Sequence, residues 1–429
     1  MAEGAVPLTA PVRKGPKPGV VLAMLLLVYT FNFLDRQILG ILVEPIKDDL
    51  GLSDAEFGAF GGIAFALLYS ILGVPLSLLA DRTRRSWVIA GALAFWSGFT
   101  ALCGTATSFW QMFAFRMGVG IGEAGGVAPS YALIADYFPP HKRARALAIF
   151  SLGVPVGLAG GTLLGAYIAE LVNWRAAFLF MGVAGVLLAP IFLFIVKDPP
   201  RPAAAAKPAP LLSVFPIIGK KPSFWLLSFA ASCSSLCGYG MALWTPAVLM
   251  RSFGMDMIGT GQFLGGLLLI GGTAGVFGGG WLADKLGVLD RRWYPGLPAI
   301  AWIITVPCIA TAMLLEMPLW AVWLLLLIPN GLNILWLGPV TTAVQHLVPQ
   351  PMRATASGSF LMINNLIGIG VGPMLMGWLS DRFTGTYGDD ALLYATVSCL
   401  GFYLLASVLA LLATRTIRRD WVDEDHAAA

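Results

Sequence analysis

Long apolar runs recur along the whole chain and are separated by short polar segments. Each run is close to the length of about 20 residues that crosses a lipid bilayer as an α-helix. Twelve runs are predicted, at residues 20–42, 56–80, 86–105, 110–138, 145–169, 175–196, 223–250, 258–283, 295–315, 318–346, 354–379 and 390–414. The pattern therefore predicts an all-α integral membrane protein with twelve transmembrane helices.

Composition and charge placement agree with this prediction. Hydrophobic residues make up 58% of the chain and charged residues 12%, whereas about 25% of a soluble protein is charged. Most of the 27 Lys and Arg lie on the side that carries both chain ends, and the opposite loops hold only Lys47, Arg175, Arg251 and Arg382. The positive-inside rule then predicts that both termini are cytoplasmic. The net charge of +4 follows from this placement and indicates no nucleic-acid partner.

A short pattern repeats at the ends of predicted helices. Residues 77–82, 280–285 and 377–382 each combine small residues and an apolar pair with an acid, which is Asp81, Asp284 or Asp381. A linker rich in Pro and Ala follows residue 198 and divides the chain. We expect two six-helix halves with pseudo-two-fold symmetry, at residues 1–198 and 223–429, joined by a cytoplasmic linker at 199–222. Halves of this kind bind substrate between them, near the middle of the bilayer.

Four ionisable residues lie inside predicted membrane helices of the first half. They are Asp35 and Arg36 in the first helix and Arg116 and Glu123 in the fourth. Charges at this depth cost several kcal/mol and usually mark an ion or substrate pathway. Arg116 and Glu123 are two turns apart on one helix face, with a rise of about 10.5 Å. Asp35 and Arg36 are adjacent, so they point about 100° apart and each needs a partner elsewhere.

The four charges sum to zero when all are ionised. Protonation of one carboxylate leaves a surplus positive charge, which is costly when buried and gives a way to gate a conformational change. We therefore predict Asp35 or Glu123 as the proton carrier, with Arg36 and Arg116 tuning it or binding an anionic head group. The alternative is a static ion-pair network that holds the first and fourth helices together.

The second half has no obvious charge at mid-membrane depth, but it contains polar side chains. The candidate substrate and charge network adds the following residues to the two arginines: Asn32, Tyr239, Asn330, Asn333 and Asn364. Gly and Pro at 329–331, 338–339 and 368–373 should loosen the tenth and eleventh helices, which is tolerated where the backbone lines a cavity. The alternative for each Asn is a hydrogen bond that joins helices. An ionic half that faces an apolar half describes an amphipathic cavity.

Several of these segments resemble a known family. Residues 81–85 (Asp-Arg-Thr-Arg-Arg) resemble the major facilitator superfamily signature between the second and third helices, with departures at Ser77 and Arg84. Residues 31–36 (Phe-Asn-Phe-Leu-Asp-Arg) and 116–123 are most similar to the spinster branch. The resemblance implies alternating-access transport in a cell membrane, here the bacterial inner membrane. Animal members of that branch export lysolipids such as sphingosine-1-phosphate.

The resemblance also implies a set of gating residues. In the superfamily, the acid that corresponds to Asp81 meets the start of the eleventh helix when the cytoplasmic side is shut. Arg85 is expected to pair with Asp136, and Arg82 and Asp284 belong to the same loop signatures. The alternative is that the arginines of this loop only supply cytoplasmic positive charge.

No catalytic or cofactor motif is found, and we expect no enzyme activity, no cofactor and no metal site. The leading interpretation is a monomeric, proton-coupled transporter of an amphipathic or lipid-like solute, surrounded by membrane lipids. An organic anion:proton symporter of the same superfamily is the first alternative, because Arg36 or Arg116 would suit a carboxylate. An uncoupled lipid scramblase or channel is the second, although a passive path needs no titrating group.

Overall fold

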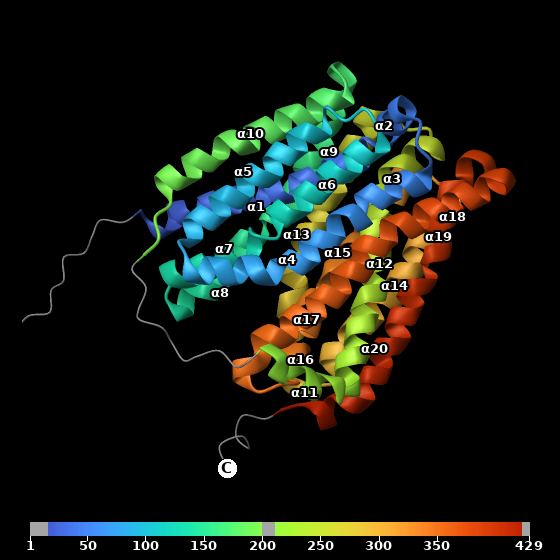
Figure 1. The fold of residues 1–429 in the computed structure, drawn as a ribbon. Helices are drawn as coiled ribbons and strands as arrows, with labels where there is room; N and C mark the ends of the chain where they lie inside the picture. Colours follow the sequence, from blue (N-terminus) through green and yellow to red (C-terminus); the bar gives the residue numbers. More distant parts are fainter. Residues whose placement is uncertain (1–15, 200–210, 423–429) are drawn as a thin grey trace, which may run out of the picture.

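The computed structural model describes residues 16–199 and 211–422, and these form helices joined by short loops. The expected linker at 199–222 and both tails of the chain lie partly or wholly outside these ranges. The helices form two bundles, one from each half of the chain (Figure 1). The described residues contain no strand, which agrees with the expected all-α class.

The first half contains ten helices. They are α1 (Pro18–Ile41), α2 (Val43–Leu50), α3 (Asp54–Gly61), α4 (Ile63–Arg82), α5 (Arg85–Cys103), α6 (Phe109–Glu123), α7 (Val127–Tyr137), α8 (Pro140–Ser151), α9 (Gly153–Leu171) and α10 (Trp174–Ile195). Several consecutive pairs form a single rod with an interruption, such as α3 and α4 at Gly62 or α8 and α9 at Leu152. Six rods cross the bundle, and α2 is a short helix at the end of the first.

The second half repeats this arrangement. It contains α11 (Phe215–Gly219), α12 (Pro222–Arg251), α13 (Met257–Leu289), α14 (Trp293–Leu314), α15 (Leu319–Leu335), α16 (Leu337–Gln345), α17 (Arg353–Asn365), α18 (Gly372–Tyr387), α19 (Ala391–Cys399) and α20 (Gly401–Asp420). The short turns η1 (Leu211–Val214), η2 (Gln350–Met352) and η4 (Gly388–Asp390) are 3₁₀-helical. The segment η3 (Leu366–Val371) is π-helical and joins α17 to α18. The expected irregularity of the eleventh helix is therefore present, and the tenth helix is interrupted at Trp336 between the two sites expected from its Gly and Pro residues.

Side-chain caps explain where several helices begin. Ser53 accepts a hydrogen bond from the backbone of Glu56, whose side chain accepts one from the backbone of Ser53, so this capping box starts α3. Asn173 caps α10 and Asp256 caps α13 in the simpler way, through one backbone N–H each. Each of these polar residues lies at the end of a loop, directly before the first residue of a helix. The sequence therefore indicates where these three helices begin.

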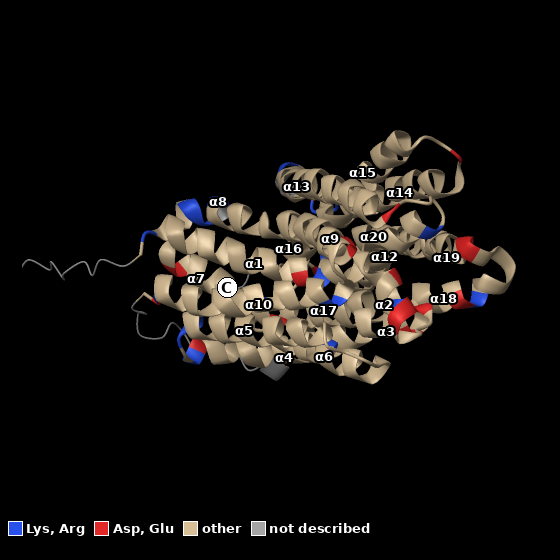
Figure 2. Cartoon of the chain, turned by 90° about the horizontal axis from the view of Figure 1, so that it is seen from above, with Lys and Arg blue, Asp and Glu red and all other residues tan. Residues whose placement is uncertain are grey.

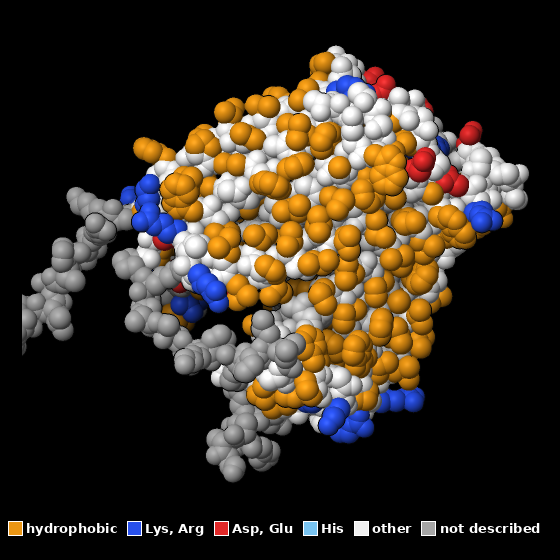
Figure 3. All heavy atoms as spheres, in the orientation of Figure 1, with side chains coloured by type: hydrophobic (Ala, Val, Ile, Leu, Met, Phe, Trp, Pro, Cys, Tyr) orange, Lys and Arg blue, Asp and Glu red, His pale blue; other side chains and the backbone are white. Residues whose placement is uncertain are grey.

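The surface and the helix lengths are those of a membrane protein. Ten stretches are long and apolar enough to span a bilayer. One of them, residues 353–420, contains two rods that run in opposite directions and therefore counts as two. A further rod, made of α6 and α7, is not among the ten, because it is interrupted at residues 124–126 and neither part reaches the required length. Hydrophobic side chains cover the sides of the bundle (Figure 3), and charged residues gather at its ends (Figure 2). The prediction of twelve transmembrane helices is thus confirmed.

The two halves meet at one side of the molecule and separate at the other. We call the side that carries Pro18 and Asp420 the terminal side, and the side that carries Asp54, Arg251 and Asp381 the far side. At the far side α3 packs against α18, and along the interface α9 packs against α13. At the terminal side the ends of the two bundles diverge (Figure 1), and the surface is hollowed between them (Figure 3). The structure is therefore closed at the far side and open toward the terminal side.

Candidate functional site

An ion pair between the first and fourth rods lies at the centre of the site. The guanidinium of Arg36 donates from Nε to Oε2 of Glu123 over 2.6 Å. Glu123 is the last residue of α6, directly before the glycine-rich interruption, and its side chain is fully buried. The Arg36 side chain is 13% exposed, so it lies at the edge of the first half. Glu123 is thus held by a cation that is itself partly exposed.

Aromatic rings surround the Arg36 guanidinium. Its central carbon lies 5.1 Å from the ring centre of Phe33, 4.8 Å from that of Phe65 and 4.9 Å from that of Tyr69. Contacts of a cation with ring faces at this range are favourable, especially away from water. Tyr239 of α12, in the second half, is within electrostatic reach of the same guanidinium. The printed contacts of Arg36 are thus with its own half, and Tyr239 is the second-half residue near it.

Asp35 points away from this interface, as expected for the neighbour of Arg36. Its carboxylate is fully buried inside the first half and accepts a hydrogen bond of 3.2 Å from the Thr100 hydroxyl of α5. Its other oxygen, Oδ1, has no hydrogen-bond partner among the described residues. A buried carboxylate with one neutral hydroxyl as partner is poorly compensated when it is ionised. Asp35 thus has the surroundings of a group that gains from taking up a proton.

Arg116 shares a helix face with Glu123, but the ion pair of Glu123 is made with Arg36. The Arg116 side chain is buried, and the described residues offer no hydrogen-bond partner to Nε or Nη1. Its guanidinium carbon lies 5.4 Å from the ring centre of Phe65, the same ring that Arg36 contacts. Asn32 is likewise buried beside Glu123, and neither of its amide atoms has a partner of normal geometry among the described residues. Buried donors and acceptors without hydrogen-bond partners among the described residues thus lie around the ion pair.

The candidate Asn residues of the second half mostly join helices. Asn333 accepts a hydrogen bond of 3.0 Å from the Tyr403 hydroxyl, and Asn364 accepts one of 2.9 Å from Ser235. Asn330 packs closely against Gly271 of α13. The structure thus brings these residues against neighbouring helices of their own half, which favours the interhelical alternative for Asn333 and Asn364. Tyr239 remains the member of this set that faces the ionic half.

The loop signature forms a compact ionic cluster at the terminal side. Arg85 pairs with Asp136 of α7 and, over 3.2 Å, with Asp81 at the end of α4. It also donates to the backbone oxygen of Ala132 over 3.4 Å. The pair that the resemblance implied, Arg85 with Asp136, is thus present, and all its members belong to the first half.

The remaining gating candidates are Arg82 and Asp284. Arg82 is exposed, and the side chain of Asp284 lies outside the described part of the chain. A further acid, Asp198, was not expected from the sequence. It accepts hydrogen bonds from the backbone and the hydroxyl of Ser86 at the start of α5. The sequence signal that could have found it is the N-terminal position of Ser86 in a helix, where an acid is favoured.

A second ionic cluster was missed by sequence reasoning. It lies at the far side, between the halves, and consists of Glu44, Lys47, Asp54, Arg251 and Asp381. Most of these charges are in or beside loops, where solvent-exposed charges are ordinary. The available signal was the repeat, because Asp381 stands in the pattern that also contains Asp81.

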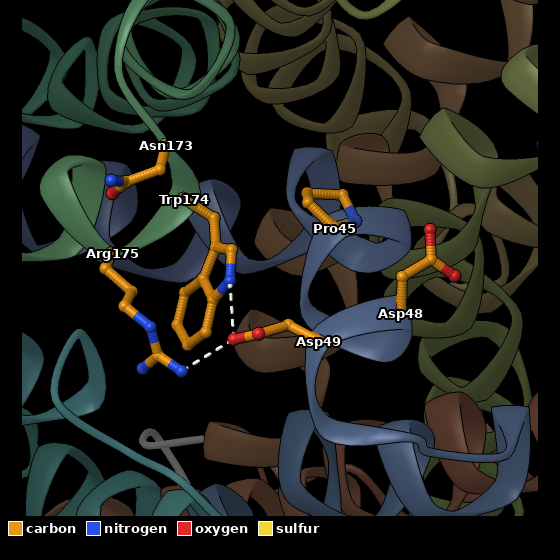
Figure 4. Close-up of a pocket in the computed structure, with 6 residues that line it drawn as sticks. All are labelled: Pro45, Asp48, Asp49, Asn173, Trp174 and Arg175. Carbon is orange, nitrogen blue, oxygen red and sulfur yellow. Dashed lines mark hydrogen bonds and ion pairs between the residues drawn. The ribbon is translucent and has the colours of Figure 1, made fainter.

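A shallow surface pocket at the far side belongs to the first half alone. It is lined by Pro45, Asp48, Asp49, Asn173, Trp174 and Arg175 (Figure 4). Inside it, Asp49 accepts from the Arg175 guanidinium over 2.6 Å and from the Trp174 indole over 3.2 Å. These polar groups satisfy one another, and the residues that line the pocket all belong to the first half. It fastens the α2 segment to α10 and is not the candidate transport site.

Comparisons with known proteins agree with this geometry. The family model of the Major Facilitator Superfamily matches residues 25–373. An MFS-type efflux pump of Mycolicibacterium smegmatis is 34% identical over 421 residues, 96% of each chain. Protein spinster homolog 1 of Xenopus tropicalis is 26% identical over 383 residues, 84% of this chain and 73% of that protein.

A solved structure is similar over nearly the whole chain. It is a bacterial homologue of the human lysosomal transporter spinster, in an inward-facing and unoccupied conformation. The two chains are 29% identical, with a TM-score of 0.83 and coverage of 95% of this chain and 99% of the other. With twelve membrane helices in two halves and a family match over most of its length, this chain belongs to the Major Facilitator Superfamily of multi-pass membrane transporters.

Proposed function

We propose that this protein is a proton-coupled secondary transporter of an amphipathic, lipid-like solute and that it works by alternating access. The observation that carries the proposal is the buried ion pair of Arg36 and Glu123, placed where the two halves face each other. The similar proteins support it, since they include an efflux pump and spinster homologues. The proposed location is a bacterial inner membrane.

The coupling step follows from the charges of the site. While Glu123 is ionised, it occupies the Arg36 guanidinium and the pair is neutral. When Glu123 takes up a proton, Arg36 becomes a cation without a counter-ion in a place where such a charge is costly. An anionic head group can then take the position of the carboxylate, with two parallel hydrogen bonds to the guanidinium. Proton and anionic head group are thereby linked through one side chain.

Asp35 is proposed as the second proton site. It shares the buried region with Arg116, and both have polar atoms without partners among the described residues. Its hydrogen bond to Thr100 places it inside the first half, away from the space between the halves. It therefore acts on the charge balance of the site and does not touch the solute.

The apolar part of the solute is proposed to lie toward the second half. Tyr239 lies opposite Arg36, and the Asn side chains of that half are used by neighbouring helices. A charged end at Arg36 and an apolar body against the second half describe a lysolipid-like molecule. An organic anion without an apolar body would use the first half alone.

The terminal-side cluster is proposed to act as the cytoplasmic gate. Arg85 orients Asp81 through the ion pairs with Asp81 and Asp136. The acid at residue 81 would then meet the start of the eleventh rod, at α17, when that side closes, because helix N-termini favour negative charge. Arg82 and Asp284 are assigned to the same gate by their positions in the loop signatures. With both termini in the cytoplasm and one chain as the working unit, the structure corresponds to an inward-facing carrier.

The test is flux in proteoliposomes that contain the purified protein and a labelled lysophospholipid, with and without an imposed pH gradient. Glu123→Gln keeps the shape of the side chain and cannot release a proton. We expect it to lower gradient-driven flux by about tenfold or more, and to leave exchange without a gradient less affected. The matched control is Arg175→Gln, which removes a far-side ion pair inside the first half.

Three outcomes separate the competing functions. Equal flux with and without the gradient in the unsubstituted protein means an uncoupled scramblase or channel. Gradient-driven flux of small carboxylates, and none of the lysophospholipid, means an organic anion symporter. Normal pH dependence of Glu123→Gln removes this carboxylate from the coupling step.

A further inference from the structure

The far-side cluster joins the two halves through one arginine. Arg251, at the end of α12, donates from Nη1 and Nη2 to the two carboxylate oxygens of Asp54 over 2.8 and 2.9 Å. It also donates from Nε to Glu44 over 2.8 Å. Asp54 and Glu44 belong to the first half and Arg251 to the second. Paired hydrogen bonds between a guanidinium and a carboxylate are among the strongest that side chains form.

Asp54 is nearly enclosed by this arrangement. Its residue is 3% exposed, and it accepts a further hydrogen bond of 2.6 Å from the Ser380 hydroxyl of α18. Lys47 also pairs with it from within the first half. A carboxylate with this many charged and polar partners is well compensated where it stands, in contrast to Asp35.

Asp381 makes a second connection between the halves. Its two carboxylate oxygens accept hydrogen bonds from the backbone N–H groups of Asp54 and Ala55, over 3.0 and 2.8 Å. These are free N–H groups at the start of α3, where negative charge is favoured by the helix dipole. The end of the eleventh rod thus caps the start of the second rod.

The sequence repeat gives this contact a meaning. The repeated pattern stands near the end of the second rod with Asp81 and near the end of the eleventh rod with Asp381, and these two rods run in opposite directions. Asp381 now caps the start of the second rod at the closed far side. Asp81 stands at the terminal side, where the halves are apart, and is held by Arg85. The acid of this pattern is therefore bound to the other half at the closed side and to Arg85 of its own half at the open side.

We propose that Asp381 and the Arg251–Asp54 pair form a far-side latch that holds the far side shut and must open once in every transport cycle. The proposal does not depend on the proton-coupling step or on the identity of the solute. It assigns a role in the transport cycle to the charges that join the two halves at the far side.

The first half already contains replacement partners for the open state. When Arg251 withdraws, Lys47 can keep Asp54 paired, which avoids the large cost of a lone buried charge. When Asp381 withdraws, water can reach the N–H groups of Asp54 and Ala55 at the opened far side, and the capping box of Ser53 and Glu56, which uses other N–H groups, still holds the start of α3. A static structural contact needs no such substitutes, whereas a latch that opens repeatedly does.

The experiment measures distances between spin labels in the full-length protein, without solute or gradient. One pair, at Leu171 and Thr386, joins the halves across the far side, and a second pair, at Lys142 and Arg415, joins them across the terminal side. The native cysteines are replaced so that only these positions carry labels. Asp381→Asn, Arg251→Gln and the conservative Arg251→Lys are compared with the unsubstituted latch.

We expect each latch variant to raise the ratio of far-side-open to far-side-closed molecules by about tenfold, the factor for losing one hydrogen bond to a charged group. A longer far-side distance should appear together with a shorter terminal-side distance. The control Arg175→Gln breaks the ion pair with Asp49 at the same side but within one half, and should change neither distance.

Two results would overturn the proposal. One is a set of folded latch variants, with unchanged thermal midpoints, that keep the distances of the unsubstituted protein. The other is a looser far side without any change at the terminal side, which would show a static contact and no link to the transport cycle. If Arg251→Gln fails to fold, Arg251→Lys and Asp381→Asn still give the answer. Loss of proton coupling in the flux assay leaves this test unaffected.

Discussion

Arg36 and Glu123 are 87 positions apart in the sequence and form an ion pair of 2.6 Å inside the first half. Arg116, which shares a helix with Glu123, does not form that bond. The cation that holds Glu123 therefore comes from another rod and lies at the edge that faces the second half. A change in the charge of Glu123 therefore alters the charge balance of Arg36 directly.

Asp35→Asn should remove pH-driven transport and leave binding of the solute within about threefold. The reason is that Asp35 contacts Thr100 inside the first half and not the guanidinium of Arg36. Binding at fixed pH and flux across a pH series measure the two effects separately. An affinity loss as large as the flux loss would place Asp35 in the solute site instead.

Arg36→Lys should weaken binding of an anionic lysolipid by about tenfold, since an ammonium group cannot make the two parallel bonds of a guanidinium. An uncharged analogue with a similar apolar chain should bind as before. Arg116→Lys serves as the matched control, because Arg116 is buried behind Phe65. We expect it to shift the pH at which transport is half-maximal and to leave affinity nearly unchanged. Equal losses for both analogues in Arg36→Lys would contradict a head-group role.

Gly58→Ala should weaken the closed far side. A methyl group at Gly58 would lie 2.5 Å from the backbone oxygen of Pro373 and 2.8 Å from Cα of Met374, both in α18. Such overpacking against backbone costs about 1–3 kcal/mol. Cysteines introduced at the contact of α3 with α18 should therefore become more reactive toward a water-soluble thiol reagent. Gly73→Ala is the control, because nothing lies within 4 Å of its added methyl group. The same reactivity in both variants would show that the close crossing of α3 and α18 does not limit opening.

Arg85→Ala should slow transport and favour the terminal-open state, because Asp81 loses the partner that orients it. Cysteine accessibility at the terminal ends of α4 and α17 reports this state. Arg418→Gln is the control, since Arg418 pairs with Asp290 at the same side but within the second half. Unchanged accessibility in Arg85→Ala would mean that the arginines of this loop only supply positive charge on the cytoplasmic side.

Tyr403→Phe should lower stability and spare transport. It removes the hydroxyl that donates to Asn333, and a buried hydrogen bond of this kind contributes about 1 kcal/mol. A thermal midpoint lowered by a few degrees, with flux and pH dependence unchanged, is the expected result. If Tyr403→Phe lost flux while its thermal midpoint stayed unchanged, Asn333 would instead be a candidate solute-binding residue.

The sequence by itself determined the helices and the residues that carry charge into the membrane. Helix positions follow from a local rule, because every backbone polar group in lipid must be satisfied within its own helix. The predicted runs and the observed rods therefore agree to within a few residues at most ends, such as 20–42 against Pro18–Ile41. The opposed directions of Asp35 and Arg36 also follow locally, from the turn of one helix.

Only the tertiary structure decided which charges meet. Two partners were open to Glu123, and the packing of α1 against the fourth rod selected Arg36 over Arg116. Arg251 and Asp54 are 197 positions apart, and in the sequence each resembles an ordinary charge near a loop. A pairing between separate helices depends on how whole rods pack, and one chain contains no local signal for it. Which side of the protein is closed depends on the same long-range contacts, so the sequence could place Asp381 in the same repeat as Asp81 but could not show that it binds the start of the second rod.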